Sequence, residues 1–271
     1  MKILNKAFVV TGAGGGIGSE LALGVLAHGG RVAAVDLKQE ALDALKEKAG
    51  ELANKLSLHA INITDKAAVA ELPKAVIEAH GQVDGVINCA GIIQPFVKIN
   101  DLEYDAIERV MSVNFYGTLY MTKTFLPFLL KCPEAHIVNV SSMGGFLPVP
   151  GQSIYGASKA AVKLMTEGLY AELLDTPVHV SVVFPGATAT NITKNSNVGG
   201  PSLEDAGPKA KKIAAKMLPP NEAAEIILNG VEKNKVQIFT GSDSKAMNRL
   251  YRLNPVSATK LIAKQMKSLL G

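Results

Sequence analysis

Short apolar runs rich in β-branched residues alternate with longer stretches of helical periodicity along most of the chain. The apolar runs occupy residues 7–10, 31–35, 57–61, 83–87, 136–140, 178–184 and 236–239. Helical stretches lie between most of these runs, such as residues 17–28, 40–53, 66–79 and 153–174. Continuous apolar strands separated by amphipathic helices are typical of a parallel sheet buried on both faces. The pattern therefore predicts an α/β fold, a single-domain doubly wound parallel sheet with helices on both faces.

The pattern also divides the chain into one large unit and a short extension. Residues 1–240 carry the alternation, and 271 residues are too few for two independent enzymatic domains. Residues 188–217 fit neither a strand nor a long helix, so they are predicted to form either an active-site lid, the favoured interpretation, or a mobile surface loop. In residues 241–271, apolar and basic residues share a helical pattern that Pro255 divides. This segment is predicted to be a basic amphipathic C-terminal helical extension.

The net charge of +4 belongs to this extension. Residues 245–271 contain six basic residues and no acidic ones, so removing those six from +4 leaves −2 for the rest of the chain. A general nucleic-acid-binding surface is therefore not expected. A basic amphipathic helix can lie on an anionic membrane surface, or it can dock on its own domain or a neighbouring subunit. Docking is the favoured interpretation, with the lysines on the solvated face.

Cysteine and histidine usage indicates the compartment and argues against a metal site. Cys89 and Cys132 form no disulfide framework, which is typical of a reducing, cytoplasmic compartment. The five histidines are scattered without paired ligand spacing, so no metal site is predicted. No signal peptide is expected before the first strand. Residues 176–193, an uncharged stretch, contain two prolines and are not expected to span a membrane.

Glycines follow the first predicted strand and begin the first predicted helix. Residues 11–18 read Thr-Gly-Ala-Gly-Gly-Gly-Ile-Gly. Such glycines let the backbone turn sharply and approach a pyrophosphate, and the helix N-terminus adds unpaired N–H donors. Asp36 ends the second predicted strand, where a carboxylate can bond both ribose hydroxyls and repel a 2′-phosphate. The pattern predicts a dinucleotide site that prefers NAD, although Asp36 can alternatively cap the next helix.

Four polar residues suggest acid–base chemistry. Tyr155 and Lys159 are four residues apart in a helical stretch and therefore share a face. A neighbouring ammonium and a positively charged nicotinamide would lower the tyrosine pKa from its usual value near 10. The alternative is an ordinary surface pair. Ser142 follows a strand and can bond a substrate oxygen, whereas Asn114 lies in the helical stretch 105–130 and is either a site residue or a satisfied core amide.

In their order and spacing, these motifs resemble the short-chain dehydrogenase/reductase family, in its branch of ordinary length, which has a Rossmann-like fold. The matching segments are residues 11–18, 88–91, 114, 141–145, 155–159 and 185–186. They cover residues 6–190. Cys89 replaces an asparagine that the family often has, and Asn62-Ile63 replaces the usual Asp-Val or Asp-Leu beside the adenine. The second departure affects affinity more than identity.

The resemblance implies hydride transfer between NAD(H) and a secondary alcohol or ketone. Tyr155 would be the general acid/base, Ser142 would orient the reacting oxygen, and Lys159 would lower the tyrosine pKa and hold the nicotinamide ribose. Asn114 would support a water-linked proton relay to Lys159, and the protein would be a homo-oligomer. The cofactor-binding residues would be Gly12, Gly16, Ile17, Gly18, Asp36, Asn62, Ile63, Asn88, Ala90, Gly91, Tyr155, Lys159, Pro185, Gly186, Thr188 and Thr190.

The segments expected to face the substrate are mainly apolar. The expected wall residues are Ile93, Phe96, Met143, Phe146, Leu147, Val149 and Met217, with Gln94 and Gln152 as isolated polar groups. A hydrophobic small molecule is therefore favoured over a charged acid. Two alternatives remain: a non-catalytic dinucleotide sensor, and a peripheral membrane dehydrogenase acting on a lipid, steroid or retinoid. The intact set of Asn114, Ser142, Tyr155 and Lys159 argues against the sensor.

Overall fold

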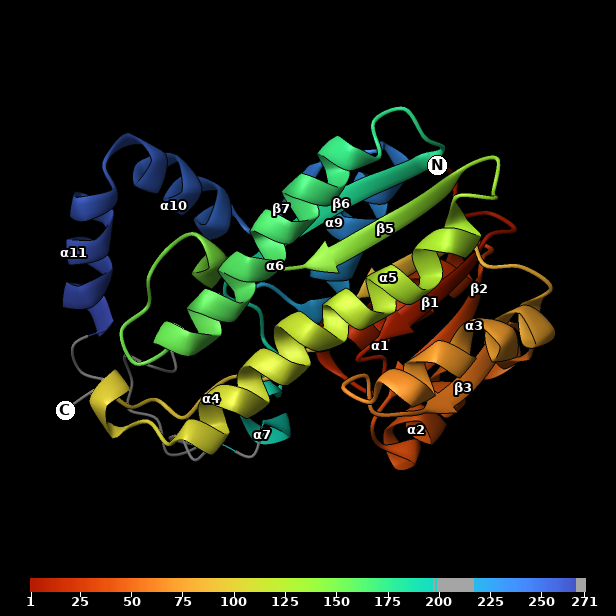
Figure 1. Cartoon of the computed structure of the whole chain (residues 1–271), viewed down its shortest axis with the longest axis horizontal. Coiled ribbons are helices and arrows are strands. Elements are labelled where there is room, and N and C mark those ends of the chain that lie inside the picture. The colour runs from red at the N-terminus through yellow and green to blue at the C-terminus, as the bar shows by residue number, and fades with distance from the viewer. Residues whose placement is uncertain (197, 199–216, 267–271) are drawn as a thin grey trace.

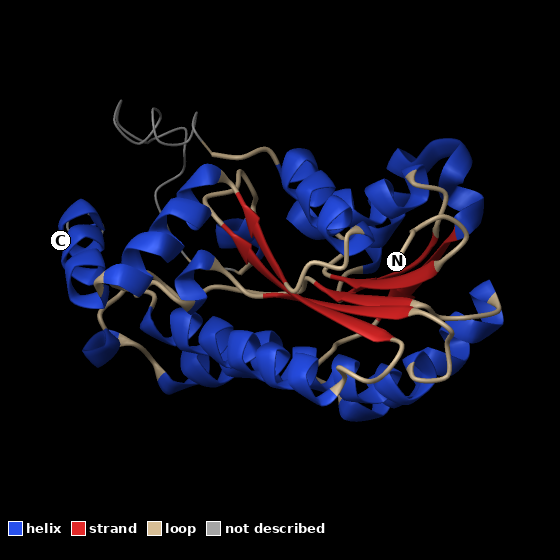
Figure 2. Ribbon diagram, turned by 90° about the horizontal axis from the view of Figure 1, so that it is seen from above, coloured by secondary structure: helices blue, strands red, loops and turns tan. Residues whose placement is uncertain are grey.

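A seven-stranded parallel sheet forms the centre of the molecule (Figures 1 and 2). The structure is a computed structural model that describes residues 1–196, 198 and 217–266. The strand order is β3-β2-β1-β4-β5-β6-β7. The strands are β1 (Ala7–Thr11), β2 (Arg31–Asp36), β3 (Leu56–Ala60), β4 (Gly85–Asn88), β5 (Ala135–Val140), β6 (Val178–Pro185) and β7 (Gln237–Thr240). The order reverses beside β1, and ligands bind at such a switch point, outside the carboxyl ends of the strands.

Helices cover both faces of the sheet, as Figure 2 shows, so the predicted fold class is confirmed. One face packs against α1 (Gly16–Ala27), α2 (Gln39–Ala49) and α9 (Pro220–Glu232). The other packs against α3 (Lys66–His80), α5 (Thr118–Leu129) and α6 (Ser153–Glu172). Helix α4 (Tyr104–Met111) continues into α5 through a π-helical turn, Ser112–Gly117. The shorter elements are the 3₁₀ turns Gly50–Lys55, Ile99–Asp101 and Met143–Gly145, and α7 (Ile192–Asn195).

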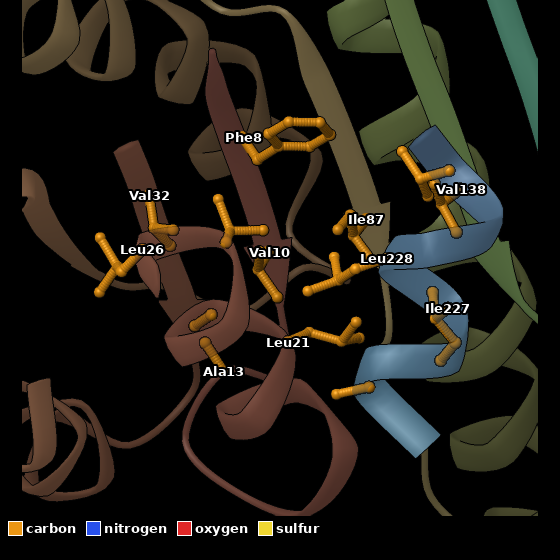
Figure 3. Close-up of a cluster of buried hydrophobic side chains, with 14 of the residues drawn as sticks. Phe8, Val10, Ala13, Leu21, Leu26, Val32, Ile87, Val138, Ile227 and Leu228 are labelled. Carbon is orange, nitrogen blue, oxygen red and sulfur yellow. The ribbon is translucent and has the colours of Figure 1, made fainter. Parts of the chain in front are cut away.

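Alternate residues of each strand enter one of two hydrophobic clusters. Phe8 and Val10 of β1 point to the α1 and α9 side, where Leu21 and Leu228 are fully buried against them (Figure 3). Val9, between them, points to the opposite face and joins the cluster under α3, α5 and α6. Because both faces are buried, β1 carries apolar residues at consecutive positions, which explains the unbroken apolar runs in the sequence.

The C-terminal extension packs against the end of the domain. It forms α10 (Ser242–Leu253) and α11 (Pro255–Met266), which lie at one end of the sheet (Figure 1). The Ser244 hydroxyl is buried and donates to the Phe184 carbonyl at 2.8 Å. Leu147 is buried in a small cluster with Ala258 and Ile262 of α11. None of the described helices is both long and apolar enough to cross a membrane.

The predicted lid is described only at its two ends. Residues 197 and 199–216 lie outside the described residues. At the described ends the backbone pairs with itself, because Leu218 N donates to the Ala187 carbonyl at 2.9 Å and Ala189 N donates to the Leu218 carbonyl at 3.0 Å. The segment therefore leaves and re-enters the domain at one place, beside the carboxyl end of β6.

Candidate active site

A cleft of about 470 Å³ runs along the carboxyl ends of the central strands. This is where the switch point of the sheet predicts a ligand. The cleft brings together most of the residues that the sequence indicated. They are Gly12, Gly16, Ile17, Gly18, Asp36, Asn62, Ile63, Ala90, Gly91, Ser142, Tyr155, Lys159, Pro185, Gly186, Thr188 and Thr190. Asn88 and Asn114 are not among its lining residues.

Three glycines of the turn at one end of the cleft have no room for a side chain. Gly12 has a φ of 70°, and a Cβ there would lie 2.8 Å from Ala90 Cα. A Cβ on Gly14 would lie 2.8 Å from the Asp36 carboxylate, and one on Gly18 would collide with the Gly12 carbonyl. No side chain caps the N-terminus of α1, which begins at Gly16. The turn is thus a bare backbone cradle beside helix N–H donors, which fits the pyrophosphate of a dinucleotide.

Asp36 lies at the end of β2, beside this cradle. Its carboxylate accepts from Gly14 N at 2.9 Å and from Lys38 N at 3.2 Å, so it steadies the turn and also bonds the start of the next connection. A carboxylate offers about four acceptor sites, so capacity remains for ribose hydroxyls. The side chain of Lys38, which is exposed, also lines the cleft. Lys38 was not among the residues that the sequence indicated.

The adenine end differs in detail from the expectation. The side-chain oxygen Oδ1 of Asn62 accepts from Thr64 N at 3.0 Å and from the Thr64 hydroxyl at 2.9 Å. That oxygen is already bonded within its own turn, so it is a poorer acceptor for an adenine amino group than the sequence suggested. The Asn62 amide nitrogen has no such local bond among the described contacts. Ile63, largely buried, supplies an apolar wall.

Asn88 supports the sheet instead of facing the cleft. Its side chain is buried and donates to Asn139 at 2.8 Å and to Thr122 at 3.1 Å. These bonds link β4 to β5 and α5. Thr11, which the sequence did not single out, ties β1 to the next segment by accepting from the backbone N–H groups of Cys89 and Ala90, both at 3.1 Å. Asn88 therefore acts on the cleft through the position of β4.

Ser142, Tyr155 and Lys159 meet at the other end of the cleft. Ser142 follows β5, and its hydroxyl accepts from Gly144 N at 3.0 Å. Gly144 lies against the Tyr155 ring, because a Cβ added there would be 3.4 Å from both the ring and the Ser142 hydroxyl. Lys159 lies one helical turn after Tyr155 and donates to the Val140 carbonyl at 2.9 Å. Tyrosine, serine and lysine from two elements thus converge on one point.

Burial controls the protonation of these groups. It lowers the pKa of Lys159 to about 8, because an ammonium is poorly solvated there. Burial also raises the pKa of Tyr155, and interaction with Ser142 opposes that rise. The lowering that the sequence predicted for Tyr155 is therefore not found in the chain itself. The desolvation of the phenolate outweighs the favourable interactions around it.

Asn114 lies behind the cleft wall, in the π-helical turn between α4 and α5. It is fully buried and bonds both backbone groups of Ile92, accepting from N at 2.8 Å and donating to O at 2.9 Å. It also donates to the Ser158 hydroxyl at 2.9 Å. A Cβ on Gly91 would lie 3.0 Å from Lys159 Nζ and 3.3 Å from Asn114 Oδ1, so Asn114 is close to Lys159 and does not bond it. Asn114 is thus a satisfied amide that shapes the site.

Several expected substrate-wall residues serve the architecture instead. The Phe146 ring packs against Phe184 and Tyr251, and Leu147 is buried under the extension. Gln94 and Gln152 are both buried and bond backbone groups. In the described part of the chain, the cleft lining also includes Ile92, Asn191, Ile192 and Asn195, which the sequence did not indicate, and Asn195 lies beside Gly15 of the glycine turn. No local pattern in the sequence distinguishes these from surface residues.

Comparison with known proteins identifies the family. The family model for short chain dehydrogenases matches residues 6–199. SadH of Mycobacterium tuberculosis is 34% identical over 260 residues, which are 95% of this chain and 94% of that protein. The 3-oxoacyl-[acyl-carrier-protein] reductase FabG of Thermotoga maritima is 33% identical over 236 residues, or 84% of this chain and 91% of FabG.

Solved structures agree with this. A short chain dehydrogenase/reductase from Burkholderia phymatum in complex with NAD superposes with a TM-score of 0.84 at 25% identity, over 94% of this chain and 95% of that one. A short chain dehydrogenase from Burkholderia cenocepacia in complex with NADP gives a TM-score of 0.79 at 26% identity, over 97% and 99% of the two chains. The chain is therefore an oxidoreductase with a nicotinamide-dinucleotide cleft, and it belongs to the short-chain dehydrogenase/reductase family.

Proposed function

We propose that this protein transfers a hydride between NAD(H) and a hydrophobic secondary alcohol or ketone. The observation that carries the proposal is the convergence of Ser142, Tyr155 and Lys159 in the cleft that also holds the glycine cradle. The nicotinamide, when bound, accepts or supplies the hydride. The protein's part is to orient the substrate oxygen and to move one proton. A non-catalytic sensor would have no chemical use for the tyrosine and serine together.

Tyr155 is the proposed general acid/base. In alcohol oxidation its phenolate oxygen takes the hydroxyl proton as the carbinol C–H leaves with its electron pair. In ketone reduction the neutral phenol returns that proton to the carbonyl oxygen, so the two directions balance. The Ser142 hydroxyl accepts from Gly144 N, which leaves its own proton to orient the reacting oxygen.

Lys159 and Asn114 support this proton transfer. One proton of the Lys159 ammonium is committed to the Val140 carbonyl, and the remaining two can bond a ribose hydroxyl and a water. The ammonium also favours the Tyr155 phenolate once the alcohol proton is taken. Asn114 holds Ile92 in place through a hydrogen bond. Its side-chain oxygen lies close to Lys159, where a water-linked relay would end.

The proposed cofactor preference rests on Asp36. Its carboxylate faces the cleft beside the glycine turn, and it would repel the like charge of a 2′-phosphate. Lys38 acts in the opposite direction, but it is exposed and therefore screened by solvent. For the substrate, the name of FabG indicates reduction of a ketone, and Ile92 and Ile192 add apolar side chains to the lining of the cleft. These features support an uncharged, hydrophobic alcohol or ketone.

The proposal also includes a cytoplasmic homo-oligomer. Leu164 on α6 is 70% exposed, and Tyr116 beside α5 is 45% exposed, so apolar side chains are available on this side of the molecule for a second copy. Docking buries part of the apolar surface of α10 and α11, with Ala258 and Ile262 in the cluster around Leu147, whereas Leu253 and Val256 stay exposed. Peripheral membrane attachment is not part of the proposal.

A substrate panel tests the proposed chemistry. Secondary alcohols, hydroxysteroids and hydroxyacyl compounds are incubated with NAD or NADP, and wild type is compared with Tyr155→Phe. We expect NAD-linked turnover of an apolar alcohol, and a loss of about a thousand-fold in the variant, the upper range for one proton-transfer group. Turnover that survives in Tyr155→Phe would overturn the proposed role of the phenol. Silence across the panel while NADH binds would favour the sensor.

A further inference from the structure

Helix α6, which carries Tyr155, has no cap from its own sequence. Its first helical residue is Ser153, and the preceding residue, Gln152, makes no side-chain bond to the first turn. An α-helix leaves its first N–H groups without intrahelical partners, and a local Ser, Thr, Asp or Asn usually accepts from the second and third of them. In α6 these are the N–H groups of Ile154 and Tyr155 itself.

A side chain from a distant segment supplies the missing cap. The side-chain oxygen Oε1 of Gln94 accepts from Ile154 N at 2.8 Å and from Tyr155 N at 3.0 Å. The amide nitrogen of the same side chain donates to the Gly151 carbonyl at 3.0 Å, just before the helix. Gln94 is completely buried, so water cannot replace these bonds. The side chain therefore bonds both the helix start and the turn that leads into it.

The segment that holds Gln94 is itself fixed at several points. Asn114 bonds both backbone groups of Ile92, and the Ser196 hydroxyl accepts from Ile93 N at 3.0 Å. The Gln152 side chain donates to the Gln94 carbonyl at 2.9 Å. Because these bonds hold its backbone, the Gln94 side chain can fix the position of the first turn of α6. Because Tyr155 lies in that turn, its phenol is placed relative to Ser142 through Gln94.

We propose that Gln94 is a positioning residue for Tyr155, one that caps α6 from another part of the chain and fixes the first turn of the catalytic helix. This inference rests on the proposed role of Tyr155 in the reaction. The physical basis is that losing the cap leaves two buried N–H groups unpaired, so the turn frays or shifts. A displacement of about 1 Å at a reacting group is enough to cost on the order of a hundred-fold in rate.

The test uses three variants of the full chain. Gln94→Leu keeps the volume and removes both polar atoms, whereas Gln94→Glu keeps the acceptor. Gln152→Leu is the matched control, since it removes a buried amide that bonds the same segment without touching an N–H of α6. Amide hydrogen exchange of the first turn of α6 reports the cap without any turnover. Steady-state kinetics then give kcat and the cofactor KM.

We expect Gln94→Leu to lose exchange protection at Ile154 and Tyr155, and kcat to fall about ten- to a hundred-fold while the cofactor KM changes little. Gln94→Glu should restore the protection while the new carboxyl is protonated, because only the acid form can replace the donor to the Gly151 carbonyl. The protection of both amides should therefore shift with pH and weaken as the buried carboxyl ionises. Gln152→Leu should keep the protection of both amides. If Gln94→Leu does not fold, the protection and its pH dependence in Gln94→Glu decide the question.

The proposal is overturned if Gln94→Leu keeps both amides protected, or if its folded fraction keeps the wild-type kcat. Equal deprotection in Gln152→Leu would also overturn it, because any buried amide would then suffice. Failure of the chemistry has a different signature. If Tyr155→Phe retains turnover while Gln94→Leu loses protection, the cap exists but the helix does not carry the acid/base.

Discussion

The two ends of the cleft are built by opposite means. At the cofactor end, function depends on side chains that are missing: Gly12, Gly14 and Gly18 leave bare backbone where any Cβ would meet another atom. At the substrate end, function depends on side chains that bond segments far away along the chain. Gln94, for example, accepts from a backbone N–H of α6. The glycines of the cofactor end all lie in one short segment. The contacts of the substrate end join segments that are distant in the sequence.

The difference shows in what each end does with polar groups. Asp36 has one carboxylate oxygen on Gly14 N and still faces the cleft. Both polar atoms of the Gln94 side chain bond backbone groups, and the residue does not line the cleft. Asp36 therefore contacts a ligand directly, and Gln94 acts through the helix that it holds. Substitutions at the two ends should separate binding from turnover.

The largest effect is expected at Gly12. Gly12→Ala forces an L-residue to a φ of 70° and places a Cβ 2.8 Å from the Ala90 backbone. We expect NADH affinity to fall by about a hundred-fold or more, since strain and overlap together exceed roughly 2–3 kcal/mol. Titration by nicotinamide fluorescence measures this directly.

The control is Gly168→Ala on the exposed side of α6, where a Cβ meets nothing within 4 Å. Alanine is the better helix former, so this variant should gain about 0.5–1 kcal/mol of stability and bind NADH normally. Equal loss of NADH binding in both variants would show that the effect is not specific to the glycine turn, and it would contradict the contrast between the two ends of the cleft.

A smaller effect is expected at Asp36. Asp36→Ala removes a charged acceptor for the ribose hydroxyls, worth about 1.5–3 kcal/mol, so NADH binding should weaken roughly ten- to a hundred-fold while NADPH gains in relative terms. Asp36→Asn keeps an acceptor for Gly14 N and separates charge from loop geometry. Lys38→Ala should weaken NADPH and spare NADH. Wild-type preference for NADPH would contradict the Asp36 argument.

The smallest functional effect is expected at Phe146. The ring packs against Phe184, Phe239 and Tyr251, so Phe146→Ala should lower the free energy of unfolding by about 2 kcal/mol, below the full cost for a core ring because Phe146 is only half-buried. Substrate selectivity should stay nearly unchanged. Thermal unfolding and the ratio of kcat/KM for two alcohols check both statements. A large selectivity change without loss of stability would restore Phe146 to the substrate wall.

The fold was predictable because its signals are local. The strand of residues 7–10 is apolar at every position since β1 is buried on both faces. The glycine turn, Asp36 and the Tyr155–Lys159 pair were also readable, because each lies within a few residues of the element that positions it. Their ordered spacing, matched to a family, added Ser142 and Asn114.

What could not be predicted depends on contacts between distant segments. Gln94 and Gln152 looked like polar groups in an apolar wall, because the hydrogen-bond partners of both side chains lie about 60 residues away along the chain. Asn88 matched a family motif, but only the packing of β4 against β5 and α5 shows that its side chain points into the protein. The direction of the Tyr155 pKa also depends on burial, which no local pattern reports.

The most direct test of the account is the pH dependence of kcat for ketone reduction, in wild type beside Tyr155→Phe. Reduction needs a protonated Tyr155, and burial raises its pKa, so the phenol keeps its proton at neutral pH. Lys159 is charged below its pKa of about 8 and loses its proton above it. We expect a constant rate below about pH 8, a fall above it, and no comparable rate in the variant. A rate that rises with pH, or that persists in Tyr155→Phe, would contradict it.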